Sequence, residues 1–264
     1  MAPKVLDLGS ITIHTYGLIL ALAFIAGIWI TSRAASKTGI EPDTIWNLGL
    51  IVILAALLGS RFLLLLSNYH YYSRNLRDIF SLSALRSLPV YYGGLLLALA
   101  FGVWFLKKKR LSAVRMADLA APGISLGQAI ARIGCLMAGC CYGKLTTMPW
   151  GITFTSEYAH ENTGVPLNIP LHPTQIYDSI GGFGIFLLLL QRLGKKHFNG
   201  QIILEYLILY AILRFITEFF RDDERSFVLY GLLSTSQLIA SITVLGSIAF
   251  YCALWHHRRE TPLS

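Results

Sequence analysis

Long apolar runs separated by short polar connections occupy most of the sequence. A helix needs about 20 apolar residues to cross a bilayer, and runs of roughly that length recur along the chain. We predict about seven membrane helices, at Tyr16–Ser32, Ile45–Leu66, Val90–Leu106, Leu119–Tyr142, Ile176–Leu190, Ile202–Phe220 and Leu232–Trp255. The fourth run is the least regular because it contains Pro122 and Arg132. The pattern therefore predicts an all-helical, polytopic membrane protein, with residues 1–264 forming a single membrane domain.

The distribution of basic residues predicts how these helices are oriented. The strongest cluster, Lys107–Arg110 with Arg115, follows the third run, and cytoplasmic connections carry an excess of Lys and Arg. We therefore expect the N-terminus outside and the C-terminus in the cytoplasm. Two connections longer than turns, at about residues 67–89 and 143–171, then fall on the external side. Connections of this length are usually functional, and we expect them to form a small cap.

Composition agrees with this interpretation, because 55% of the residues are hydrophobic and only 14% are charged, outside the usual soluble mixture. The formal net charge is +8 at pH 7. The basic residues stand at the ends of the apolar runs and form no single patch, so we expect anionic lipid headgroups as partners and no nucleic acid. The first run is not preceded by a basic cluster or followed by a cleavage site, so it is expected to remain as a helix.

Charged residues within the apolar runs are the strongest functional signal. A charge at the centre of a bilayer costs about 2.5–3.5 kcal/mol on insertion scales and seldom persists without a partner or a task. Arg132 is interpreted as an anion ligand, with a structural role, pairing with backbone carbonyls or with Asp118, as the alternative. Arg214 and Glu218 are four residues apart, so they form either a plain intrahelical ion pair or part of the same site. Arg221 extends their basic face toward the external surface.

A polar segment, His172-Pro-Thr-Gln-Ile-Tyr-Asp178, stands where the second long connection enters the fifth predicted helix. His172, Gln175 and Asp178 recur at three-residue intervals, so they share one helix face. Polar side chains at a helix start also satisfy free backbone amides, which is the alternative. Their concentration at this one position favours a site.

Glycines stand at similar depths in two of the predicted helices. Gly93 and Gly94 open the third, and Gly139 and Gly143 lie at the end of the fourth. Each one alone is explained by close helix packing, whereas together with the arginines they indicate a cradle for an anionic headgroup. Arg61 lies within the second predicted helix, where structural and functional interpretations are equally supported.

The three cysteines in the fourth run admit several interpretations. Cys135, Cys140 and Cys141 could bind a metal together with His172, but C-x4-C-C lacks the C-x2-C spacing typical of zinc sites. Adjacent cysteines also bridge poorly as a disulfide. Small polarizable residues that pack closely between helices are the commonest explanation, so we expect neither a metal nor a cofactor.

Three motifs together resemble the prolipoprotein diacylglyceryl transferase family of bacteria. Arg132–Gly143 is similar to the family signature Gly-Arg-hydrophobic-Gly-Asn-x-x-Asn-Gly-Glu-x-x-Gly. His172–Tyr177 resembles the family's His-Pro-Ser/Thr-Gln-x-Tyr segment, and Arg214–Arg221 resembles its Arg-x-x-x-Glu-Phe-x-Arg segment. Shorter elements fall in the matching order, namely Tyr16-Gly17, Gly59-Ser-Arg61 and Gly93-Gly94.

The resemblance implies a reaction at the bacterial inner membrane. The diacylglyceryl group of phosphatidylglycerol passes to the thiol of the lipobox cysteine in a preprolipoprotein, which forms a thioether and releases glycerol phosphate. The resemblance implies that Arg132 and Arg214 bind the phosphate and that Glu218 orients Arg214. The expected catalytic residues are Arg132, Arg214, His172 and Tyr92. The expected substrate-binding residues are Tyr16, Arg61, Gly93, Gly94, Gly139, Gly143, Gln175, Tyr177, Tyr210, Glu218 and Arg221.

Several positions depart from the family pattern. Tyr92 stands in place of the histidine that is usually regarded as catalytic, and Cys135, Ala138 and Cys140 replace two asparagines and a glutamate. A tyrosine is a poor general base at neutral pH, so His172 or an arginine-polarised tyrosine takes this role.

Two other classes of function remain open beside the transferase. A divergent paralogue would bind or move anionic phospholipid, or would transfer a glyceryl lipid to another acceptor. A small-solute transporter ranks third, because the sequence shows no internal symmetry of the kind that inverted repeats produce.

Overall fold

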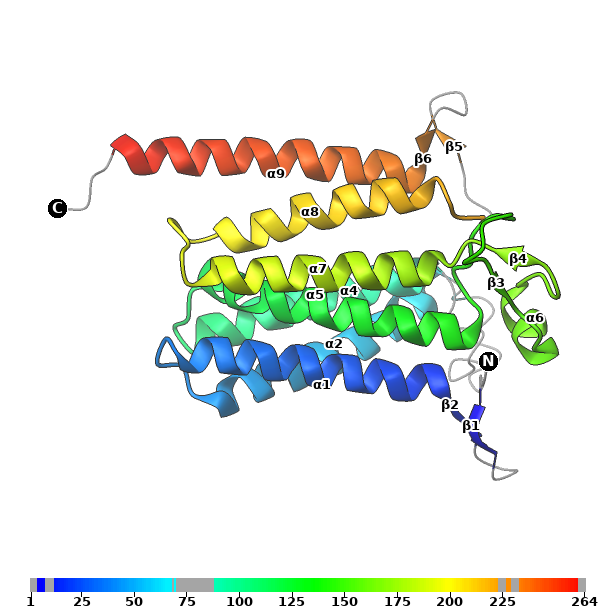
Figure 1. Ribbon diagram of the computed structural model, residues 1–264. Coiled ribbons are helices and arrows are strands. Elements are labelled where there is room, and N and C mark those ends of the chain that lie inside the picture. The colour runs from blue at the N-terminus through cyan, green and yellow to red at the C-terminus, as the bar shows by residue number, and fades with distance from the viewer. Residues whose placement is uncertain are drawn as a thin grey trace. The chain divides into compact units, whose positions relative to one another are not determined.

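A computed structural model describes residues 4–7, 12–67, 69, 88–222, 227–228 and 233–260 (Figure 1). In this part of the chain it contains eight helices: α1 (Thr15–Ser36), α2 (Pro42–Ser67), α4 (Leu88–Lys108), α5 (Ala113–Ala138), α6 (Glu157–Thr163), α7 (Thr174–Leu193), α8 (Gln201–Glu218) and α9 (Thr235–Glu260). Three short antiparallel strand pairs join β1 (Lys4–Asp7) to β2 (Thr12–His14), β3 (Ile152–Thr153) to β4 (Pro170–Leu171), and β5 (Phe227–Val228) to β6 (Leu233–Ser234). The predicted helical architecture is confirmed.

Five helices are long and apolar enough to cross a membrane, namely α1, α2, α5, α7 and α9. Many of their large apolar side chains are exposed, as a lipid-facing surface requires. The two other predicted spans coincide with α4 and α8. Helix α8 contains Glu205, Arg214 and Glu218, and the side chains of α4 are described only from Tyr92 onward. The count of seven spans stays a prediction.

Two compact units make up the chain: Met1–Thr31 with Ala117–Ser264, and Ser32–Met116. In the second unit, α2 and α4 pack closely through glycines. A Cβ on Gly93 would lie 2.5 Å from the backbone oxygen of Gly59, and a Cβ on Gly94 would lie 2.9 Å from that of Ala56. Absent side chains thus let the two backbones approach. The prediction of a single membrane domain remains untested.

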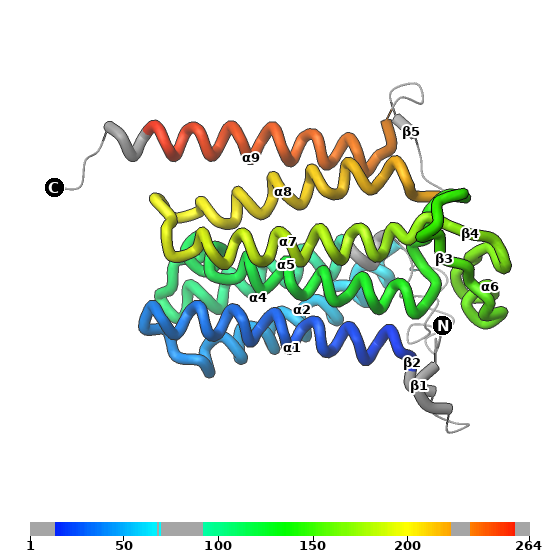
Figure 2. Tube along the Cα trace, in the orientation of Figure 1, coloured from blue at the N-terminus to red at the C-terminus, as the bar shows by residue number. Residues whose placement is uncertain are grey.

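In the first unit, α5, α7, α8 and α9 lie side by side in that order (Figure 2). Two serine hydroxyls join α5 to α7: Ser125 donates to the Gly182 carbonyl and Ser179 to the Ala129 carbonyl, each at 2.8 Å. Because hydroxyls in an apolar environment must find an acceptor, these bonds fix the register of the two helices.

Asp118, fully buried in α5, fixes the start of α8. Its carboxylate accepts hydrogen bonds from Lys196 Nζ at 2.8 Å and from the backbone amides of Gly200 at 2.8 Å and Ile203 at 3.1 Å. A carboxylate at a helix N-terminus satisfies free amides and favours the helix dipole. The alternative partnership of Arg132 with Asp118 is therefore wrong.

Helix α5 ends earlier than the hydrophobic run suggests. The predicted helix continues to Tyr142, whereas α5 stops at Ala138. Gly139 has φ +79° and Cys141 has φ +60°, and a left-handed residue terminates a right-handed helix. A Cβ on Gly139 would also lie 3.1 Å from the Ala159 side chain. Cys140 and Cys141 therefore lie in the turn that follows, outside the helix.

The connection at 143–171 folds as a small element with its own core. It contains β3, α6 and β4, and Phe154, Ala159, Val165 and Leu171 are buried together. The other predicted cap segment, at about 67–89, lies mostly outside the described residues.

Candidate active site

Two arginines from distant segments meet one buried carboxylate in the first unit. Arg132 Nε in α5 lies 3.2 Å from Asp178 Oδ2 in α7, and Arg221 Nη1 lies 3.8 Å from the same oxygen. The Asp178 and Arg221 side chains are only 6% and 4% exposed, whereas that of Arg132 is 20% exposed. Charges enclosed by apolar helices are expensive unless they are paired. The three residues therefore form the electrostatic centre of this unit.

Arg132 faces the Asp178 carboxylate with its Nε atom. Within the described part of the chain, its guanidinium group makes no hydrogen bond. Paired guanidinium N–H groups form two parallel hydrogen bonds to a phosphate or carboxylate. Because Arg132 is also the most exposed of the three, its fork is suited to an incoming anion.

The main chain around Gly143 positions Arg221. Gly143 pairs with Arg221 as an isolated β-bridge, its amide donates to the His172 carbonyl at 3.1 Å, and the Lys144 amide donates to the Phe220 carbonyl at 2.8 Å. A Cβ on Gly143 would lie 2.5 Å from the His172 oxygen and 2.6 Å from the Phe220 oxygen. Only glycine allows these three segments to meet.

Two side chains in the first turn of α7 bind the turn that follows α5, which contains Cys140 and Cys141. Thr174 Oγ1 donates to the Cys141 carbonyl at 2.7 Å, and Gln175 Nε2 donates to the Cys140 carbonyl at 2.8 Å. Helix α7 has no side-chain cap at Pro173, so the capping alternative for this polar segment finds no support. Gln175 instead joins the end of α5 to the start of α7.

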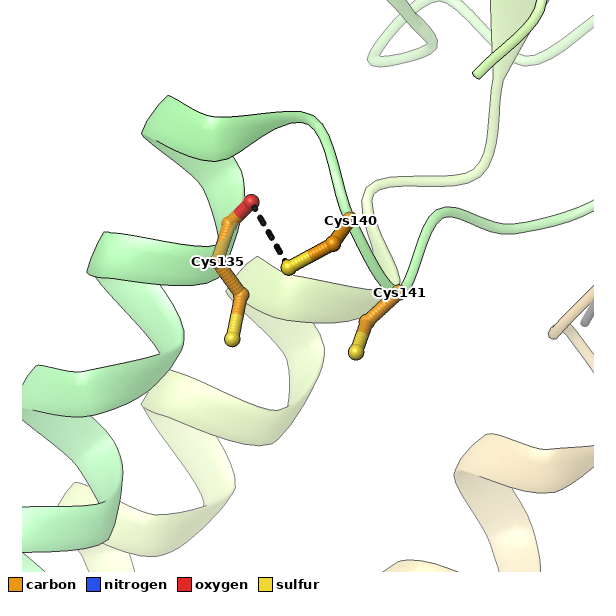
Figure 3. A group of neighbouring side chains, drawn as sticks. All are labelled: Cys135, Cys140 and Cys141. Carbon is orange, nitrogen blue, oxygen red and sulfur yellow. Dashed lines mark hydrogen bonds between the residues drawn. The ribbon is translucent and has the colours of Figure 1, made fainter. Parts of the chain in front are cut away.

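Cys135 at the end of α5 and the two cysteines of the following turn, Cys140 and Cys141, lie close together (Figure 3). Their Sγ atoms all lie within 4.8 Å of one another. Cys140 Sγ also donates to the Cys135 carbonyl at 3.7 Å. The charge of Arg132 acts on both Cys135 and Cys141, which places the thiols beside the arginine–carboxylate cluster.

Two tyrosines predicted for the site lie near Arg132. Tyr16, at the start of α1, is within electrostatic range of Arg132. Its ring packs beside Gly134 of α5, because a Cβ placed on Gly134 would lie 3.3 Å from Tyr16 Cδ2. Tyr210 in α8 is within electrostatic range of Arg132 and stacks on Tyr206 at 5.8 Å. The structure thus brings α1, α5 and α8 to one place.

Arg214 and Glu218 form the intrahelical ion pair that their spacing allows, with 2.8 Å between Arg214 Nη2 and Glu218 Oε2. Glu218 Oε1 also accepts a hydrogen bond from Ser234 Oγ at 2.7 Å, which joins α8 to β6. Glu218 is buried. The ion pair is compatible with both interpretations, so the orienting role of Glu218 and a phosphate shared by Arg214 and Arg132 stay predictions.

His172 belongs to an aromatic cluster. Its Nδ1 lies 3.1 Å from the Tyr177 hydroxyl, which accepts a hydrogen bond from Trp150 Nε1 at 2.9 Å. Phe220 packs edge-on against the His172 ring at 5.1 Å. When Nδ1 carries the proton and donates it to Tyr177, Nε2 is left as an acceptor.

Four predicted residues belong to the second unit. Arg61 lies half-buried in α2, and Tyr92 is exposed near the start of α4. Gly93 and Gly94 provide the close approach of α4 to α2 described above. Their contribution to a substrate site stays a prediction.

Some residues of the cluster were missed by sequence reasoning. Asp178 is predicted on a face with His172 and Gln175, but not as the carboxylate between Arg132 and Arg221. Ser234 and Trp150 carry no sequence signal, because their partners are distant in the chain. The three-residue spacing at the start of the fifth apolar run was the available clue to Asp178.

Comparison with known proteins gives a consistent result. The family model described as prolipoprotein diacylglyceryl transferase matches residues 3–253. The phosphatidylglycerol–prolipoprotein diacylglyceryl transferase of Clostridium tetani is 35% identical over 249 residues, which cover 93% of this chain and 94% of that protein. Proteins of the same name from Clostridioides difficile and Geobacillus kaustophilus are 34% and 33% identical. The match to the Clostridioides difficile protein covers 90% of this chain and 90% of that protein. The match to the Geobacillus kaustophilus protein covers 96% of this chain and 91% of that protein.

Proposed function

The chain belongs to the prolipoprotein diacylglyceryl transferase family, and we propose that it carries out the reaction for which its relatives are named. The diacylglyceryl group of phosphatidylglycerol is transferred to the lipobox cysteine of a preprolipoprotein. The thiolate sulfur attacks a glyceryl carbon, the carbon–oxygen bond to the phosphate breaks, and glycerol phosphate leaves. The observation that carries this proposal is the Arg132 fork beside a buried carboxylate.

The arginines would stabilise the departing phosphate. Negative charge develops on the phosphate oxygens as the ester bond breaks, and donors already aimed at that charge lower the barrier. Arg132 is preorganised because Asp178 holds its Nε atom. Arg214 is similarly held by Glu218. Both guanidinium groups therefore need little rearrangement to bind the phosphate.

Other residues would line the two substrates. Tyr16 and Tyr210 lie near Arg132, and Gly143, Gln175 and Arg221 shape the surrounding backbone. Residues assigned to the site by family resemblance are Arg61, Tyr92, Gly93, Gly94 and Gly139. His172 Nε2, oriented by Tyr177, would accept the proton of the acceptor thiol.

We also propose that the chain spans the bacterial inner membrane seven times, with the N-terminus outside. The five long apolar helices support a multi-pass protein. The basic cluster Lys107–Arg110 supports a cytoplasmic connection after α4. The element at 143–171 would then form an external cap, where a preprolipoprotein signal peptide can reach the site from the bilayer.

A transfer assay with purified protein tests this function. The protein is incubated with phosphatidylglycerol and a synthetic lipobox peptide, and the peptide mass is measured. We expect the cysteine peptide to gain one diacylglyceryl group and the matched serine peptide to gain none. If neither peptide is modified while phosphatidylglycerol still binds, the transferase proposal fails and the lipid-binding alternative stands.

A further inference from the structure

The convergence of three thiols beside the arginines has no role in the reaction as described above. Figure 3 shows the side chains of Cys135, Cys140 and Cys141 directed into one space, with Cys135 on α5 and the other two on the turn that follows. Their Sγ atoms lie within 4.8 Å of one another. All three are free thiols. A cluster of three soft sulfur ligands is the donor set that Zn²⁺ and similar cations prefer.

The sulfur positions fit such an ion with little movement. Zn²⁺ binds cysteine sulfur at about 2.3 Å, which places the sulfurs of a tetrahedral site about 3.8 Å apart. Sulfurs within 4.8 Å reach that spacing by shifts of about half an ångström each. Small rotations of χ1 within one staggered rotamer allow such shifts. The C-x4-C-C spacing is unusual for zinc because the left-handed turn at Cys141, rather than a knuckle, brings the ligands together.

The backbone that presents the thiols is held from outside. Cys141 has φ +60°, a conformation uncommon for residues other than glycine. Thr174 and Gln175 donate to the Cys141 and Cys140 carbonyls, and Gln175 is buried. Residues kept in a rare conformation by several surrounding bonds cluster at binding and catalytic sites. The turn is therefore built to hold these sulfurs together.

Positive charge lies beside two of the three thiols. The charges of Arg221 and Arg132 act on Cys141, and that of Arg132 also acts on Cys135. Three thiolates around a divalent cation carry one net negative charge, and neighbouring guanidinium groups offset it. Three protein ligands also leave one tetrahedral position open, as in catalytic zinc sites.

We propose that Cys135, Cys140 and Cys141 bind one thiophilic divalent cation of the Zn²⁺ class, whose fourth position takes the sulfur of the acceptor cysteine. The identity of this acceptor rests on the proposed function. The acceptor thiol passes its proton to His172 Nε2 on coordination, and its sulfur then forms the bond to the glyceryl carbon as the carbon–oxygen bond to phosphate breaks. The charge of the cation does not change, so no oxidant or reductant is needed.

A cobalt titration tests the site without lipid or turnover. The full-length protein, metal-free and kept reduced by a phosphine, is titrated with Co²⁺, and the thiolate-to-cobalt charge-transfer absorption is recorded. We expect saturation at one Co²⁺ per chain and displacement by Zn²⁺. Adding a cysteine lipobox peptide should change the cobalt ligand-field bands, whereas the serine peptide should not. Absence of charge-transfer absorption, or bands that the cysteine peptide leaves unchanged, would overturn the proposal.

Cysteine variants identify the ligands. Cys135→Ser, Cys140→Ser and Cys141→Ser should each weaken Co²⁺ binding by more than about tenfold, because even changes outside the ligand shell cost 10- to 100-fold. The matched control is Cys252→Ser, since Cys252 is exposed on α9, and its affinity should equal that of the unaltered protein. Equal affinities in all four variants would place the metal elsewhere and overturn the proposal.

Labelling of the unaltered protein covers the case of a variant that fails to fold. Alkylation is followed by peptide mass spectrometry with and without Cd²⁺. We expect Cd²⁺ to protect Cys135, Cys140 and Cys141 but not Cys252, and equal labelling in both conditions would contradict the site. A protein that binds metal yet fails the transfer assay would retain the site and lose the proposed function. A protein that catalyses transfer but binds no metal would retain the proposed function and lose the metal site.

Discussion

Arg132 and Asp178 form an ion pair between α5 and α7, with 3.2 Å between Arg132 Nε and Asp178 Oδ2. The carboxylate thus orients the guanidinium group, whose planar N–H donors recognise a phosphate. Arg221 approaches the same carboxylate oxygen from the segment after α8. One buried carboxylate, that of Asp178, therefore positions two arginines from distant parts of the chain.

Replacement of Arg132 tests the phosphate contact. Arg132→Ala should lower turnover by at least about a hundredfold, the effect of losing one donor to a developing anion. Arg132→Lys should recover only part of the loss, because an ammonium cannot form the bidentate fork. Steady-state rates with a lipobox peptide measure both. Arg192→Ala is the control, since Arg192 pairs with Glu205 and lies at the opposite end of α7. Full activity in Arg132→Ala would refute the assignment.

Arg214 should behave in the same way if it shares the phosphate. Arg214→Ala is expected to lower turnover by at least about a hundredfold. Glu218→Gln should have a smaller effect, because the amide retains a contact to Ser234 but orients Arg214 less firmly. Rates and melting temperatures are measured together. An Arg214→Ala protein that folds and turns over normally would remove this residue from the site.

Loss of the Asp178 carboxylate should destabilise the protein. Breaking a buried ion pair by removing one partner costs about 3–5 kcal/mol, and Asp178→Asn leaves Arg132 and Arg221 without their shared acid. Denaturant unfolding in detergent measures the change. Arg192→Ala should cost about 0–1 kcal/mol, because that pair is half exposed on the arginine side. Similar losses in both variants would contradict the central position of Asp178.

Gly143→Ala tests the junction of three backbone segments. The added Cβ would lie 2.5–2.6 Å from the carbonyl oxygens of His172 and Phe220, so the segments must separate at a cost of about 1–3 kcal/mol or more. We expect a lower melting temperature and a large loss of transfer. Gly184→Ala is the matched control, because no atom lies within 4 Å of its Cβ position. Equal melting temperatures would show that the junction yields easily.

The departure at Tyr92 predicts a gain of function. Tyr92→His restores the family pattern, and we expect a faster transfer rate because imidazole is a better base than phenol at neutral pH. His172→Gln should lower the rate, and Tyr177→Phe should lower it less, since it removes only the hydrogen bond that orients the ring. Peptide modification rates at saturating lipid measure all three. Unchanged rates in His172→Gln would exclude His172 as the proton acceptor.

Local patterns predicted the parts of the structure that depend on nearby residues. Apolar runs located the helices, and the spacing of Arg214 and Glu218 allowed the observed ion pair. Three-residue spacing placed Gln175 and Asp178 on one helix face, since such residues recur on one side of a helix. It was wrong for His172, which precedes α7.

Contacts between distant residues could not be read in this way. Asp178 lies on α7, so its pairing with Arg132 depends on how α5 packs on α7. Asp118 lies on α5 itself, about 21 Å from Arg132 along the helix axis at about 1.5 Å per residue, and pairs with Lys196 instead. The cysteine cluster depends on two left-handed residues, Gly139 and Cys141. Spacing rules assume a regular turn, so they gave no indication that the three sulfurs converge.

Phosphatidylglycerol labelled separately in its terminal glycerol and in its acyl chains offers the most direct measurement of the transferase claim. After incubation with the cysteine lipobox peptide, the acyl label should appear in the peptide as a thioether that resists mild base at the sulfur. The glycerol label should appear in equal molar amount as free glycerol phosphate. Acyl label in the peptide without release of glycerol phosphate, or release of glycerol phosphate without a modified peptide, would contradict the claim.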